Sequence, residues 1–152
     1  MLIMKINSKD TRMSFILTGP ECSGKTYLGT ILQEFYEFEL VHEYAREWLS
    51  GHGPSYTFKD VSDMCNKQDE MLVSTLALDR SKYVLSDTDI LNFIVWTEDK
   101  FNHVPDDWLK AWDTMEDRYY LLCSPDIPWE DDLLREDRDR REIIFERQIT
   151  AD

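Results

Sequence analysis

The segment from residue 14 to residue 37 constrains the fold of this chain more than any other. A short apolar run over 14–18 ends at a glycine, and apolar residues at helical spacing follow over 25–37. The loop between them matches the pattern G-x-x-x-x-G-K-[ST] without exception, with Gly19, Pro20, Glu21, Cys22, Ser23, Gly24, Lys25 and Thr26. Glycines in such a loop let consecutive backbone N–H groups turn inward around an anion, and the N-terminus of the following helix adds positive partial charge. The segment therefore predicts a strand, a loop that surrounds a polyphosphate, and a helix.

The last two residues of this loop have separate expected roles. Lys25 is expected to reach the β- and γ-phosphates of a nucleoside triphosphate, and the hydroxyl of Thr26 is expected to bind Mg²⁺. A glycine turn that only caps a helix is the alternative, and the strand before the loop and the helix after it disfavour that interpretation. ATP and Mg²⁺ are thus the expected ligands.

Strand and helix patterns alternate along the rest of the chain. The expected strands cover 14–18, 39–42, 82–86 and 119–123, and the expected helices cover 25–37, 57–79, 89–98, a segment from 105, and 131–147. Strands separated by helices of about ten residues or more imply right-handed crossovers and a parallel sheet covered on both faces. We therefore expect an α/β three-layer fold of the P-loop nucleoside-triphosphatase type, with about four parallel strands, over residues 13–152. Residues 1–12 precede the first clear strand and are expected to form a flexible leader.

Composition narrows the class of partner. The chain has 152 residues, about the length of one average domain. Its 31 acidic and 17 basic residues give a net charge of −14, which argues against nucleic acid as a partner because such binding needs clustered Lys and Arg. No apolar run approaches the ~18 residues of a membrane span, and the three scattered cysteines predict no disulfide framework. We expect a cytoplasmic protein with a small-molecule partner, and a homo-oligomer stays open.

Two carboxylates follow the strand expected over 82–86. In open α/β sheets ligands bind beyond the carboxyl ends of the strands. Asp87 lies at that point and is expected to hold Mg²⁺, or its waters, opposite Thr26. Asp89, two residues further on, is expected to face a substrate. The alternative for either residue is an ordinary turn residue at a strand end.

A second polar group follows the strand expected over 39–42. Glu43 is expected to point into the cleft as a hydroxyl acceptor or base, and Arg46 is expected to meet a phosphate or a partner acid. Glu43, Arg46 and Glu47 also have the spacing of a surface ion-pair ladder on a helix, which is the alternative interpretation.

The chain concentrates arginines near its end. Five of them lie within 13 positions, namely Arg135, Arg138, Arg140, Arg141 and Arg147. Phosphoryl transfer needs positive charge over the developing negative charge of the transferred group. We expect a helical lid over 131–147 whose stripe Arg135–Arg138–Arg141 faces the phosphates. A solvated helix with many i,i+4 ion pairs is the alternative.

Four stretches together resemble the NadR-type nicotinamide riboside kinases. They are ILTGPECSGKT (16–26), HEYAREWL (42–49), LSDTDIL (85–91) and LLCSPDIPWEDDLLREDRDRREIIFE (121–146). The resemblance implies transfer of the γ-phosphoryl group of ATP, with Mg²⁺, to the 5′-hydroxyl of nicotinamide riboside.

The resemblance also assigns residues. It implies that residues 19–26 cradle ATP, that Asp87 serves Mg²⁺ or the acceptor hydroxyl, and that Glu43 and Arg46 line the acceptor side. Taken with the phosphate loop, the strand ends and the arginine stripe, this gives the expected sites. We expect catalytic roles for Lys25, Asp87, Glu43 and Arg138, ATP contacts for residues 19–26 with Arg135 and Arg141, and a metal site at Thr26 and Asp87. We expect acceptor contacts for Glu43, Tyr44, Arg46, Asp89 and Trp129. Trp129 is also implied at the hinge of the lid, with Asp131, Asp132 and Arg135.

Two other functions stay open. A kinase of this type could act on another nucleoside or nucleotide, and a nucleotide-binding regulatory module without useful catalysis has the same phosphate loop. Members of the family continue past the lid into a further strand and helix that help to hold adenine, whereas this sequence ends at Asp152. We expect loose adenine binding, a neighbouring chain that completes the site, or lost activity.

Overall fold

The computed structural model describes residues 3–4, 13–78, 80–115 and 118–150. Its sheet has five strands: β1 (Ile3–Met4), β2 (Met13–Thr18), β3 (Glu39–Val41), β4 (Tyr83–Asp87) and β5 (Arg118–Leu122). They lie in the order β1-β5-β2-β4-β3, and neighbours run parallel except for β1 and β5. The four parallel strands confirm the predicted sheet.

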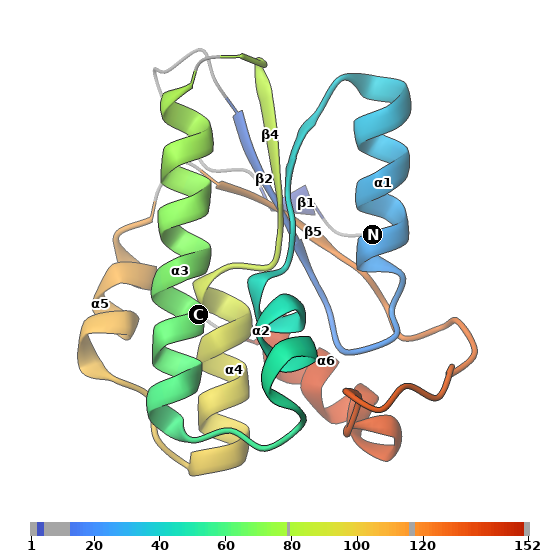
Figure 1. Ribbon diagram of the computed structural model, residues 1–152, viewed down its shortest axis with the longest axis vertical. Helices are drawn as coiled ribbons and strands as arrows, with labels where there is room; N and C mark the ends of the chain where they lie inside the picture. The colour runs from blue at the N-terminus through green and yellow to red at the C-terminus, as the bar shows by residue number, and fades with distance from the viewer. Residues whose placement is uncertain (1–2, 5–12, 79, 116–117, 151–152) are drawn as a thin grey trace.

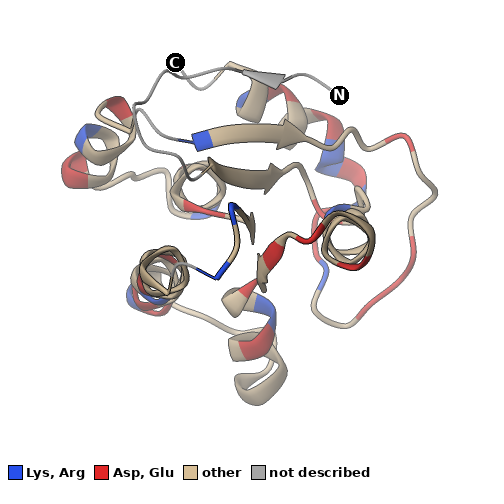
Figure 2. Ribbon diagram, turned by 90° about the horizontal axis from the view of Figure 1, so that it is seen from above, with Lys and Arg blue, Asp and Glu red and all other residues tan. Residues whose placement is uncertain are grey.

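Six helices accompany the sheet in the described part of the chain. They are α1 (Lys25–Tyr36), α2 (Tyr44–His52), α3 (Phe58–Ala77), α4 (Ile90–Phe101), α5 (Asp106–Asp113) and α6 (Arg141–Ile149), the last preceded by a 3₁₀ turn, η1 (Arg138–Arg140). The strands run between α1 on one side and α3 on the other, as two perpendicular views show (Figures 1 and 2).

Alternation along the strands explains this layering. Successive side chains of a strand point to opposite faces of the sheet. Leu17 of β2 and Leu85 of β4 form an apolar cluster with partly buried residues of α1, namely Leu28 and Leu32. The residues next to them in sequence, among them Ile16 and Val84, form a second cluster with residues of α3 and α4, namely Leu72, Leu91 and Val95. Both faces of the sheet are therefore covered, as the sequence predicts.

The carboxyl ends of the parallel strands are level with one another. Leu17 of β2 pairs with Asp87 of β4, and Val41 of β3 pairs with Ser86. The backbone pairing continues one step further, because Thr88 N donates to Leu17 O over 3.1 Å. The segments that leave β2, β3 and β4 consequently start side by side at one edge of the sheet.

The structure differs from the predicted leader at Ile3 and Met4. These two residues form β1, with Ile3 opposite Leu121 and Met4 opposite Tyr120 of β5. The pairing occupies the outer edge of β5, whose backbone N–H and C=O groups would otherwise lack strand partners. The rest of the predicted leader lies outside the described residues.

The predicted helix over 131–147 is wrong in its first half. Helical structure starts only at η1, and α6 begins at Arg141. Upstream, Asp132 closes a turn by accepting from Leu134 N and Arg135 N, and the next two backbone N–H groups donate to Glu21. The backbone N–H groups of residues 134–137 therefore bond to Asp132 and Glu21 and not to the carbonyl groups of a preceding helical turn.

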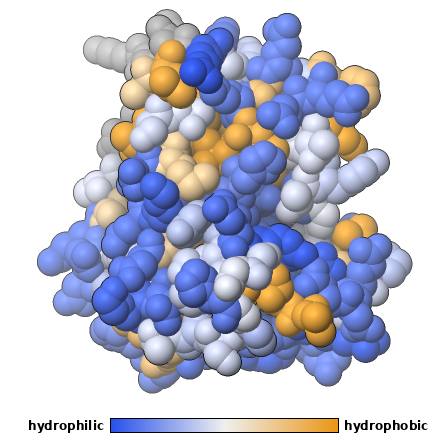
Figure 3. All heavy atoms as spheres, viewed as in Figure 1, coloured by the Kyte–Doolittle hydropathy of each residue, from blue (hydrophilic) through white to orange (hydrophobic). Residues whose placement is uncertain are grey.

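The surface of the protein is largely hydrophilic, in line with its many charged residues. Hydrophilic side chains predominate on the face shown in Figure 3. Within the described ranges, no helix combines the length and the apolar character that crossing a membrane requires.

The N-terminus of α3 provides a test of the fold. Thr57 and Asp60 form a capping box, in which Asp60 N donates to Thr57 Oγ1 and Thr57 N donates to Asp60 Oδ2. We expect Thr57→Ala to lower the free energy of unfolding by about 1 kcal/mol, because one helix N–H loses its acceptor. Urea denaturation measures this change. Thr30→Ala, at an exposed position within α1, is the control and is expected to leave stability unchanged or slightly raised; equal losses in both variants would contradict the cap's role.

Candidate functional site

The loop between β2 and α1 has the backbone of a phosphate cradle. Gly19, Cys22 and Gly24 have positive φ values of 146°, 53° and 82°. At Gly19 a Cβ atom would lie 2.5 Å from the carbonyl oxygen of Cys123, so any side chain there would clash with the end of β5. The loop thus passes close against the sheet before α1 begins, which leaves the N-terminus of that helix directed at the loop's concave side.

Lys25 arches back over this loop. Its Nζ donates to the carbonyl oxygens of Gly19 over 2.8 Å and of Pro20 over 2.7 Å. The ammonium group therefore lies at the opening of the phosphate loop. Its acceptors there are two neutral carbonyl groups, which a charged phosphate can replace.

Thr26 and Asp87 meet across the sheet edge, as the sequence predicts. Thr26 Oγ1 donates to Asp87 Oδ2 over 2.7 Å. Asp87 is only 2% exposed, and its other oxygen, Oδ1, is buried without a hydrogen-bond partner. A buried carboxylate oxygen that lacks a partner, next to a hydroxyl, is a fitting donor set for Mg²⁺. Mg²⁺ is commonly bound by one or two carboxylates together with substrate phosphates and water.

Glu43 stands beside this pair. It follows β3 by two residues and forms the N-cap of α2 with extended backbone. Burial raises the pKa of its carboxyl from 4.5 to about 7, and the negative charge of Asp87 adds to the increase, against Lys25 and Arg46. A carboxyl group with a pKa near neutrality can accept a proton from a hydroxyl and release it again.

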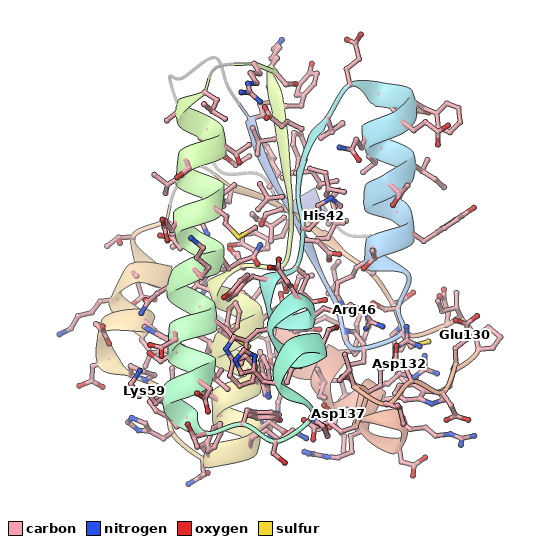
Figure 4. The ribbon with its side chains drawn as sticks, viewed as in Figure 1. His42, Arg46, Lys59, Glu130, Asp132 and Asp137 are labelled. Atoms are coloured by element: carbon pink, nitrogen blue, oxygen red, sulfur yellow. The ribbon has the colours of Figure 1, made fainter. Side chains whose placement is uncertain are left out.

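The segment from residue 124 to residue 140, which we call the lid segment, crosses the phosphate loop. Arg46 of α2 forms an ion pair with Asp132, and Glu21 Oε2 accepts from the backbone N–H groups of Glu136 and Asp137 over 3.0 Å each. Figure 4 shows Arg46 and Asp132 side by side. Of the two partners expected for Arg46, the structure shows the acid.

Two arginines of the predicted stripe reach the phosphate loop, Arg135 from the lid segment and Arg141 from the start of α6. Arg135 Nη1 donates to Cys22 Sγ over 3.4 Å, and Arg141 Nη1 donates to Cys22 O over 3.1 Å. Both guanidinium groups lie over the ring of Trp129, at 5.8 Å and 5.6 Å from its centroid. The Trp129 indole therefore makes cation–π contacts with two guanidinium groups that also donate hydrogen bonds to the phosphate loop.

The predicted stripe is wrong at Arg138. This residue is exposed, and its side chain makes no hydrogen bond or ion pair within the described part of the chain. The stripe assumes a continuous helix from residue 131, whereas Arg135 precedes the first helical turn. Arg135 and Arg141 come together through the bend of the lid segment and not through helical spacing.

A buried anchor that sequence reasoning missed fixes the far end of the lid segment. Asp99, whose side chain is 2% exposed, accepts from Arg140 Nη1 over 2.6 Å and pairs with Arg147. Its neighbour Lys100 donates to Asp137 over 2.9 Å. In the sequence these residues continue an ordinary helix pattern, so only their charge complementarity to the arginine-rich segment could have indicated the contact.

These elements enclose one cavity of about 720 Å³, large enough for a nucleotide-sized ligand. Residues of the phosphate loop, with Glu43 and Arg46, line one part of it. Apolar and aromatic side chains line another part, namely Leu49, Tyr56, Phe93, Trp96 and Ile144. A charged phosphate subsite and an apolar subsite thus share one cavity.

Asp89 does not face this cavity, so its predicted orientation is wrong. Its carboxylate caps α4 by accepting from Leu91 N over 3.0 Å, pairs with Arg118 over 2.8 Å, and accepts from the hydroxyl of Tyr120. The residue is 2% exposed. These three bonds use the carboxylate to fix the start of α4.

Two predicted aromatic contacts are also absent from the cavity lining. Tyr44 packs against the apolar cluster that contains Ala45 and Trp108. Trp129 lies beneath Arg135 and Arg141, outside the lining of the cavity. Neither position follows from the sequence, because both depend on how the segments pack.

A parallel sheet between helices, a glycine loop at the end of its central strand and a buried aspartate at the end of the neighbouring strand define an α/β fold of the P-loop nucleoside-triphosphatase type. A family model described as an AAA domain matches residues 14–151, and the chain belongs to that family.

Solved structures share this fold. A crystal structure of NadR protein in complex with NR superposes with a TM-score of 0.71 at 17% identity, covering 91% of this chain and 42% of that one. NadR protein in complex with NAD and AMP-PNP gives 0.69 at 19% identity, covering 91% and 40%. The chain spans less than half the length of each, and the resemblance to the NadR type is confirmed for the fold. No curated protein matches the chain by sequence.

The titration of Glu43 provides a test of the site. Its pKa in the folded protein is raised to about 7 from 4.5, so the folded state binds more protons between these values and stability falls as pH rises through that window. We expect Glu43→Gln to remove this fall and to be more stable than the natural protein by about 1–3 kcal/mol at pH 8, with little difference near pH 4.

Urea denaturation across this pH range measures the effect. Glu47→Gln, at an exposed position of the same helix, is the matched control and should leave the pH dependence as it is. If Glu43→Gln gives the same pH profile as the natural protein, Glu43 does not titrate near neutrality.

Proposed function

We propose that this protein is an ATP-dependent small-molecule kinase that transfers the γ-phosphoryl group of ATP to the 5′-hydroxyl of nicotinamide riboside. One observation carries the proposal. A proton-accepting carboxylate, Glu43, lies beside the Thr26–Asp87 pair and the phosphate loop in a cavity that also has an apolar part. A carboxyl group in a cavity whose pKa is raised by burial and a neighbouring acid is typical of catalytic sites, which favours a kinase over a nucleotide-binding module without catalysis.

The residues divide the work as follows. The backbone N–H groups of the phosphate loop that follow Pro20 hold the triphosphate, and Lys25 exchanges the carbonyls of Gly19 and Pro20 for phosphate oxygens. Thr26 and Asp87 would hold Mg²⁺, which would supply positive charge to neutralise the phosphates. Glu43 accepts the proton of the acceptor hydroxyl while the hydroxyl oxygen bonds to the γ-phosphorus and the bond to the bridging oxygen breaks.

The lid arginines supply further charge. Arg135 and Arg141 already contact the phosphate loop at Cys22, so a small rearrangement brings them to the transferred group. Positive charge placed there in advance stabilises the transition state more than the ground state.

The likeness to NadR protein in complex with NR supports the acceptor. A different nucleoside or nucleotide is the second candidate, because Tyr44, Asp89 and Trp129 do not line the cavity. The aromatic side chains of Tyr56, Phe93 and Trp96 line the cavity. They suit the planar ring of nicotinamide riboside as well as the base of another nucleoside or nucleotide.

Acceptor-dependent release of ADP tests the proposal. Purified protein with Mg²⁺ and ATP is given a panel of ribosides and nucleoside monophosphates, and ADP is followed. We expect turnover with nicotinamide riboside, no detectable turnover in Lys25→Ala, and a loss of about 100-fold or more in Asp87→Ala. The control is Lys59→Ala, an exposed residue of α3 far from the lid segment (Figure 4), which removes one positive charge without touching the cavity. ATP binding without turnover on any acceptor would leave a binding module.

The lid arginines are tested separately. We expect Arg141→Ala to lower kcat about tenfold or more while the Kd for ATP changes less than about threefold, since the charge acts chiefly in the transition state. Single-turnover kinetics and ATP titration measure the two quantities. Equal losses in both would assign Arg141 to ground-state binding.

A further inference from the structure

Gln68 is a fully enclosed polar side chain outside the cavity. It lies in the middle of α3 and is 1% exposed. Nothing in the sequence pattern marks it, since a glutamine at such a position reads as part of the polar face of a helix. A buried amide of this kind is costly unless its donors and acceptor are all engaged.

The Gln68 amide holds the backbone on both sides of Glu43. Its Oε1 accepts from Tyr44 N over 2.8 Å, and its Nε2 donates to His42 O over 3.3 Å. These are the residues directly before and after Glu43. The turn from β3 into α2 is thereby fixed by one side chain from a different helix.

The same amide also reaches the residues around Asp87. Gln68 Nε2 donates to Ser86 Oγ over 3.0 Å, and Ser86 Oγ in turn donates to Thr88 O over 2.7 Å. Ser86 and Thr88 flank Asp87, and Thr88 has a positive φ of 90°, which a β-branched residue rarely adopts. The hydroxyl bond helps to hold this unfavourable backbone in place.

We propose that Gln68 is a positioning residue that, through Ser86, sets the separation and orientation of the two carboxylates Glu43 and Asp87. The inference rests on the proposed function for its catalytic meaning. Within the described part of the chain, the Gln68 amide bonds to Tyr44, His42 and Ser86, and not to the phosphate loop or to either carboxylate. Gln68 can therefore affect phosphoryl transfer only by holding the backbone next to Glu43 and Asp87.

This role predicts a specific set of changes. In Gln68→Met, a change of similar size that removes the hydrogen bonds, the turn at Glu43 loses its anchor and the carboxylate moves away from Asp87 toward water. We expect the pKa of Glu43 to fall from about 7 and kcat to fall about tenfold or more, because small misplacements of catalytic groups are costly. The Kd for ATP should change less than about threefold.

The titration is read directly by carboxyl carbon NMR of the protein without substrates, with Glu43→Gln used to assign the signal. Thr97→Val is the matched control. Thr97 is 0% exposed, and its hydroxyl bonds only to Phe93 O and Ile94 O within its own helix. It should destabilise the fold without altering the Glu43 titration or the ratio of kcat to ATP affinity.

Ser86→Ala is the second variant, in case Gln68→Met does not fold. It cuts the same chain of bonds at the Asp87 end and is expected to shift the Glu43 titration in the same direction. Where both variants fold, their effects on kcat should be less than additive, since they break one connection.

The outcomes separate this inference from the proposed function. If Gln68→Met or Ser86→Ala keeps the wild-type titration of Glu43 and wild-type kcat, the positioning role is wrong. A titration that shifts in a protein with no acceptor-dependent turnover would support the positioning of the carboxylates and reject the kinase.

Discussion

Strand ends that lie level at one edge of a parallel sheet are the constraint on which this site depends. Backbone bonds extend the pairing just past the strands, from Thr88 N to Leu17 O over 3.1 Å and from Cys123 N to Thr18 O over 2.8 Å. The phosphate loop leaves β2 at this level, so its Thr26 meets Asp87 at the end of β4 at 2.7 Å. Glu43 follows β3 by two residues, close to the same level. Three groups that are distant in the sequence therefore lie at one edge of the sheet without any long loop.

Several acidic groups are buried close together at this edge of the sheet. Glu21, Glu43 and Asp87 are buried or partly buried carboxylates, and burial raises the pKa values of Glu21 and Glu43. The basic side chains nearby are held by partners that a ligand could replace. Lys25 donates to carbonyl groups of the loop, and Arg46 pairs with Asp132. Arg135 and Arg141 contact carbonyl groups, a thiol and the Trp129 ring. Under the proposed function, a polyphosphate with its cation would replace these partners. The protein is strongly acidic overall, yet its local arrangement keeps several positive groups ready for an anion.

Local rules succeeded wherever a single segment decides its own conformation. The G-x-x-x-x-G-K-T loop and the apolar runs of the parallel strands depend on near neighbours, and the structure shows both of them. The position of Asp87 followed from a general property of parallel sheets. Asp89 has the same local sequence character as Asp87, but its carboxylate is engaged by Arg118 and Tyr120, which come from β5. No pattern within residues 85–91 contains that information.

The sequence alone determined the fold class, the phosphate loop with Lys25 and Thr26, and the carboxylate at the end of β4, because periodicity and glycine placement act over a few residues. Tertiary structure alone decided the path of the lid segment, where Glu21 and Asp132 take backbone N–H groups that a helix would need. It also decided the Asp99 anchor and the place of Gln68 between two strand ends. Hydrogen bonds and ion pairs between distant segments form only once the chain has packed, so their partners cannot be read from spacing.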